Sequence, residues 1–157
     1  MYKFFVVLGL FIVPSSIFAA TTATATITYT IASIDAISIS GNPSPLNVTT
    51  AVAGSQPTSA VDSTTTYAVT TNNTARRVTG SLASNMPTGV TLTVALVAPT
   101  GGTSAGAVTL STTAAALVTG IANLAQASLG ITYTLAATAS AAQVTAATNT
   151  LTYTIGP

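Results

Sequence analysis

The sequence has no cysteine, no histidine, no tryptophan and no glutamate. Without cysteine no disulfide can form, and zinc lacks its thiolate and imidazole ligands. Without histidine a serine–histidine–aspartate triad is excluded. General acid–base catalysis would fall to Asp35, Asp62 or a tyrosine. We therefore do not expect an enzyme, and we expect no catalytic residue, no metal site and no cofactor.

Charge is nearly absent as well. Charged residues make up 3% of the chain, against about 25% in ordinary domains. There is no basic patch for nucleic acid, and no phosphate-binding loop or dinucleotide motif points to a small-molecule substrate. Because charge keeps protein surfaces apart, this composition favours association, and identical subunits are the expected partners.

The first residues have the pattern of a secretory signal. Met1–Lys3 form a short basic region, and Phe4–Val13 are an apolar run that is too short to span a bilayer. Ile17, Phe18 and Ala19 suit a signal peptidase, so we expect residues 1–19 to be removed. The protein is predicted to be secreted, to the cell surface or an extracellular filament.

Behind the signal, threonines alternate with apolar residues, which predicts a β-strand with one hydroxyl face and one apolar face. This N-terminal strand is expected over residues 20–34, with the alternation beginning at Thr22. Asp35 interrupts the alternation, and Ile37 and Ile39 resume it. The apolar positions are the candidate interface residues: Ala23, Ala25, Ile27, Tyr29 and Ile31.

Further alternating runs follow, separated by turn signals. Apolar residues mark expected strands around 46–52, 65–71, 78–82, 90–96, 108–110, 131–137 and 151–155. Asn72-Asn73 predicts a hairpin-type turn. The stretch 114–130 is ambiguous, and a short strand followed by a loop or single turn is favoured. About seven or eight such strands indicate an all-β, antiparallel, Greek-key (immunoglobulin-like) β-sandwich over residues 35–157.

A short motif occurs three times, as Ile-Thr-Tyr-Thr-Ile at 27–31, Ile-Thr-Tyr-Thr-Leu at 131–135 and Leu-Thr-Tyr-Thr-Ile at 151–155. The intervals are irregular, so the chain is not a solenoid. Either β-forming residues were placed in alternation independently, or the three strands share a role and pack their tyrosines on the same core.

The four charges outside the signal are Arg76, Arg77, Asp35 and Asp62. One interpretation of the arginine pair is a charge at a strand edge or turn that limits unwanted pairing. The other is an ion pair between subunits, with Asp35 or Asp62 as partner, which would orient the contact.

Several of these features together resemble the major pilins of the chaperone–usher type, above all the cysteine-less colonisation-factor class. Residues 71–78 resemble the central hairpin of such pilins, and residues 110–114 resemble a loop that follows it. More generally, the chain is similar to secreted β-sandwich subunits of bacterial and archaeal matrix filaments. The C-terminal strand ends in Thr154–Pro157 and lacks the glycine-plus-tyrosine lead-in of the pilins.

The resemblance implies a pilus or extracellular filament subunit with a role in cell adhesion, and an assembly chaperone and usher as partners. The N-terminal strand of one subunit would complete the sandwich of its neighbour by β-augmentation. A self-complemented surface-layer or adhesin module is the alternative. Ice binding by the threonine face and carbohydrate recognition by tyrosines are weaker alternatives.

Overall fold

The computed structural model describes residues 21–157, so the predicted signal peptide at 1–19 lies outside the described residues. The chain divides into two compact units, residues 1–31 and residues 32–157, and each is described by itself. In the first unit, residues 21–31 form neither helix nor strand. In the second unit, β1 begins only at Asp35. Residues 21–34, the described part of the strand expected over 20–34, therefore form no strand in the single chain.

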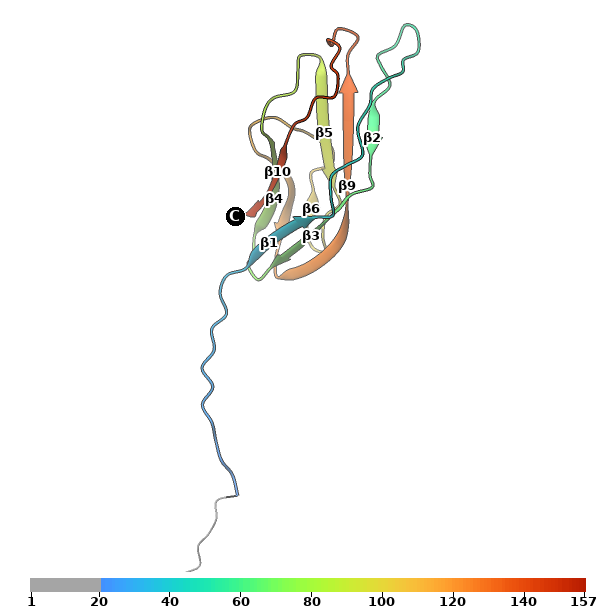
Figure 1. The fold of residues 1–157 in the computed structure, drawn as a ribbon. Coiled ribbons are helices and arrows are strands. Elements are labelled where there is room, and N and C mark those ends of the chain that lie inside the picture. Colours follow the sequence, from blue (N-terminus) through green and yellow to red (C-terminus); the bar gives the residue numbers. More distant parts are fainter. Residues whose placement is uncertain (1–20) are drawn as a thin grey trace, which may run out of the picture. The chain divides into compact units, whose positions relative to one another are not determined.

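The second unit contains two antiparallel sheets (Figure 1). The larger sheet has the order β1-β3-β9-β5-β7, and β2 also pairs with β9. Its strands are β1 (Asp35–Ile39), β2 (Ala60–Asp62), β3 (Thr66–Thr71), β5 (Val90–Leu96), β7 (Val108–Thr109) and β9 (Leu124–Ala137). β9 curves (Figure 1), and its first half pairs with β3 while its second half pairs with β5 and β2.

The smaller sheet has the order β10-β4-β8-β6. Its strands are β4 (Arg76–Leu82), β6 (Thr103–Ser104), β8 (Ala115–Ile121) and β10 (Leu151–Gly156). The first three strands all belong to the larger sheet, whereas every connection from β3 to β10 crosses between the two sheets. The expected all-β antiparallel sandwich is confirmed.

The core lies between the sheets and consists of the inward residues of the alternating strands. Val94 and Leu96 of β5 and Ile131 and Tyr133 of β9 are buried in it. Their outward neighbours are threonine and alanine, since successive side chains of a strand point to opposite faces. The buried apolar set is completed by Tyr67, Val69, Val78, Leu82, Leu110, Leu117, Val118, Ile121 and Leu129.

Two local predictions were wrong. Asn72-Asn73 does not close a hairpin, because β3 and β4 belong to different sheets, and the positive φ of this connection falls on Ala75. Within 114–130 the favoured short strand is present as β8, but the loop expected after it is limited to residues 122 and 123, because β9 begins at Leu124. Pairing with β3 imposes the extended backbone there, although alanine and glutamine have low strand propensity.

Among residues 21–157 there is no helix of the length and hydropathy needed to cross a membrane.

Candidate assembly site

The predicted interface residues are exposed in the single chain. Ile27, Tyr29 and Ile31 have 80%, 81% and 76% of their surface accessible to solvent, and Ala23 and Ala25 are exposed too. No strand ladder of the described residues includes any part of 21–31. A large apolar side chain gains about 1.5–3 kcal/mol on full burial. Burying these exposed side chains against another surface would therefore contribute substantially to binding.

The other two copies of the repeated motif are strands of the sandwich. Residues 131–135 belong to β9 and residues 151–155 to β10. Tyr133 is 4% exposed, and Tyr153 packs against the same core. The hydroxyl of Tyr153 donates a hydrogen bond to that of Tyr133, with 3.0 Å between the oxygens. Tyr133 and Tyr153 therefore pack on the same core, as the hypothesis of a shared role expects. Tyr29 does not pack on the core of its own chain.

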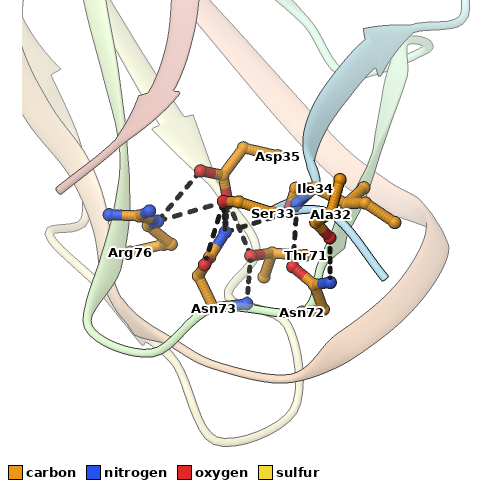
Figure 2. A network of polar contacts seen from close by, with 8 residues as sticks. All are labelled: Ala32, Ser33, Ile34, Asp35, Thr71, Asn72, Asn73 and Arg76. Carbon is orange, nitrogen blue, oxygen red and sulfur yellow. Dashed lines mark hydrogen bonds and ion pairs between the residues drawn. The ribbon is translucent and has the colours of Figure 1, made fainter. Parts of the chain in front are cut away.

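The chain enters the sandwich through residues 32–35, which are held by polar side chains of the β3–β4 connection (Figure 2). The amide of Asn72 bridges two main-chain groups of this entry segment. Its nitrogen donates to the carbonyl oxygen of Ala32 at 2.7 Å, and its oxygen accepts from the amide of Ile34 at 2.8 Å. Asn72 thus replaces a strand partner, and the β1 ladder continues from Asp35.

Asp35 is the centre of this polar cluster (Figure 2). Its carboxylate accepts a hydrogen bond from the hydroxyl of Thr71 at 2.6 Å and one from the amide of Asn73 at 3.1 Å. The guanidinium of Arg76 lies 3.0 Å away. The Thr71 hydrogen bond is the main cause of a lowered pKa of Asp35; Asn73 and Arg76 lower it further, against partial desolvation.

Three of the four residues predicted to form intersubunit ion pairs have partners within their own chain. Arg76 and Asp35 pair within the chain, and this pairing was not foreseen because it joins residues far apart in the sequence. Asp62 is buried and accepts hydrogen bonds from the main-chain amide and hydroxyl of Thr64. Arg77 is exposed, and ion pairs between subunits remain a prediction.

A second surface feature lies where β9 ends and β5 begins. On β9, burial of the inward side chains decreases from Ile131 and Tyr133 to Leu135 and Ala137, which are only half-buried. On β5 it decreases in the same direction, toward Val90, which is paired with Ala137. The inward face of the larger sheet is therefore poorly covered at this end, and a cavity of about 910 Å³ lies over it.

Two segments outside the strands border this cavity, one at 45–51 and one at 141–147. The first is paired only at its end, through an isolated bridge between Ala51 and Pro57. Both are found at the end of the sandwich where β9 ends (Figure 1). We call this feature the open furrow; its floor is formed by Met86, Val90, Leu135 and Ala137, and its walls by residues 45–51 and 141–147. The furrow was not foreseen. Its only signal in the sequence was the strand expected around 46–52. The structure forms no strand there and only one isolated bridge, between Ala51 and Pro57.

Neither feature offers groups for chemistry on a small molecule. No aspartate or arginine lines the open furrow, and no cluster of metal-ligating side chains occurs among the described residues. What the exposed segment and the furrow offer is apolar surface beside main-chain groups without strand partners, which suits recognition of an extended polypeptide. Comparisons with protein-family models, with curated proteins and with solved structures found no match to this chain.

Proposed function

We propose that this protein is a structural subunit of an extracellular filament, in which residues 22–31 of one subunit become a strand in the sandwich of the next. The observation that carries the proposal is the unequal burial of one repeated motif. Its copies in β9 and β10 pack tyrosines on the core, whereas Ile27, Tyr29 and Ile31 are about four-fifths exposed.

The energetics support a stable contact. Ile27, Tyr29 and Ile31 together would gain roughly 5–9 kcal/mol on full burial, before any main-chain hydrogen bonds are counted. Residues 22–31 would span about 33 Å at roughly 3.3 Å per residue, which is enough to cross a sandwich. The contact is heterologous because the donor and acceptor surfaces are different. When such a contact is repeated from subunit to subunit without closing into a ring, it produces a filament.

The near absence of charge is consistent with this function, because repulsion between neighbouring subunits is minimal. The self-complemented module is less well supported, because it requires residues 22–31 to pair within their own chain. Among the described residues, they take part in no strand ladder.

Negative-stain electron microscopy of the secreted protein tests the proposal, and we expect filaments. Replacing both Ile27 and Tyr29 by serine should abolish them, while the protomer keeps its thermal midpoint. The matched control replaces Thr26 and Thr28 by serine, which alters the hydroxyl face of the same segment and should leave filaments intact. Wild-type protein that stays monomeric at high concentration, or serine variants that still polymerise, would contradict the proposal.

A further inference from the structure

We propose that the open furrow is the receiving site for residues 22–31 of a second copy of this chain. This inference rests on the proposed function and adds to it the surface on which the next subunit docks. Three independent features of the furrow support it: its floor, its walls and its lack of charge.

The floor is core surface without sufficient cover. Val90, Leu135 and Ala137 stand on the inward faces of β5 and β9, in the same rows as Val94 and Ile131, which are fully buried. The inward apolar side chains of β5 and β9 therefore extend beyond the part of the sheet that the rest of the chain buries. A strand laid over them would extend the core by the same alternation that builds it elsewhere.

The walls have main-chain groups without partners. Among the described residues, no hydrogen bond involves the main chain of 44–49 or of 142–148. In the first wall, Leu46 and Val48 are half-buried while Asn47 and Thr49 are exposed, which is the alternation of a strand. A segment with strand alternation and free amides and carbonyls is a template for β-augmentation.

The chemistry of furrow and segment matches. Residues 22–31 contain only threonine, alanine, isoleucine and tyrosine, and no charged side chain lines the furrow. The second wall consists largely of small residues, among them Ala142, Ala146 and Ala147, which leaves room for isoleucine and tyrosine side chains. The competing site is the seam where β1 and β10 lie side by side. Apolar side chains pack against the core there, as Leu46 and Met86 do in the furrow, so the experiment has to distinguish the two sites.

The cysteine-free chain allows the position to be tested by single disulfides. One batch of full-length subunits carries Ala137→Cys, and others carry a cysteine at one of the apolar positions of the segment, from Ala23 to Ile31. Mixed filaments are oxidised and analysed on non-reducing gels. A disulfide needs Cα atoms within about 7 Å, so we expect a covalent dimer with at least one donor position.

Ala136→Cys is the matched control, because it neighbours Ala137 on β9 but points to the opposite face, and no dimer is expected from it. Ser38→Cys on β1 and Thr154→Cys on β10 report the competing seam. If filaments form but cross-link only through the seam positions, or do not cross-link through Ala137, the furrow is not the receiving site. The proposed function would still stand in that case. Absence of filaments in every mixture contradicts the proposed function itself.

A second measurement does not depend on disulfide geometry. Ala137→Arg places a charge in an apolar site and should lower the polymerised fraction by about tenfold or more, while Ala136→Arg should leave it nearly unchanged. Circular dichroism must show folded protomers for both variants. Equal polymerisation of the two variants would contradict the furrow as receiving site. A variant with Ala137→Cys and a donor cysteine in the same chain tests docking between copies. If this variant formed only disulfides within one chain, docking between copies would be contradicted.

Discussion

The hydroxyl of Tyr153 on β10 donates a hydrogen bond to the hydroxyl of Tyr133 on β9, so that a polar contact joins the two sheets next to the apolar core. Burial and this hydrogen bond raise the pKa of Tyr153, which keeps its proton on the oxygen well above neutral pH. The two tyrosines come from two copies of the same repeated motif, and the threonines between the apolar positions point away from the core.

The tyrosine pair predicts non-additive effects on stability. Tyr153→Phe leaves the buried hydroxyl of Tyr133 without its partner and should cost about 1–3 kcal/mol of unfolding free energy. Tyr133→Phe should cost less, because Tyr153 is only half-buried. The double Phe variant should be nearly as stable as the wild type. Urea unfolding of the four proteins measures the coupling, and strictly additive losses would show that the contact contributes nothing.

Ile27 and Ile131 occupy the same position in two copies of the motif, and they allow a matched comparison. Ile131 is fully buried, so Ile131→Ala should lower the unfolding free energy of the protomer by about 2–5 kcal/mol. Ile27→Ala should change it by less than about 0.5 kcal/mol. Thermal or urea unfolding of the protomers makes the comparison. A large protomer loss from Ile27→Ala would indicate that this side chain is buried in its own chain.

These results show what the alternation in the sequence could and could not predict. β5 and β10 were predicted well because their inward residues are large and regularly spaced. Residues 22–31 have equally clear alternation but no strand. The pattern defines which face of a strand is apolar, whereas the partner that completes the strand is a long-range property that no local pattern contains.

The candidate site was predictable only in part. Its apolar residues at the N-terminus could be named from the alternation alone. The ion pair of Arg76 with Asp35 within one chain was not predicted, because the sequence does not reveal that β1 and the β3–β4 connection meet. The open furrow depends on how far β5 and β9 extend beyond the smaller sheet, and no sequence motif encodes that extent.

The cluster around Asp35 predicts acid sensitivity. The pKa of Asp35 in the folded chain lies below the ordinary value of 3.8, so its stabilising contribution is present above that value. It is lost as the pH falls from 3.8 through the lowered pKa, because the unfolded state then binds more protons. The thermal midpoint of Asp35→Asn, measured from pH 2 to 6, should show less of this loss than the wild type.

The same cluster allows its causes to be separated. The hydrogen bond from Thr71 is the largest single cause of the lowered pKa of Asp35, and the Coulombic effect of Arg76 is the smallest. Thr71→Ala should therefore weaken the pH dependence more than Arg76→Gln, which removes the charge. Arg77→Gln is the control, since Arg77 is exposed and lies outside the cluster. The opposite ranking of Thr71→Ala and Arg76→Gln would mean that the ion pair, and not the hydroxyl, governs the carboxylate.

Gly80 on β4 is predicted to be intolerant of a side chain. A Cβ atom there would lie 2.9 Å from Cδ1 of Leu117, with Leu110 and Leu151 at 3.5 Å. Leu117 is fully buried and cannot move without disturbing the core between the sheets. Gly80→Ala should therefore lower the unfolding free energy by about 1–3 kcal/mol. Gly156→Ala on β10 is the matched control, because nothing lies within 4 Å of its added Cβ, and it should be neutral or slightly stabilising. If urea unfolding gave the two alanine variants equal stability, the tight packing of β4 against β8 at this position would be refuted.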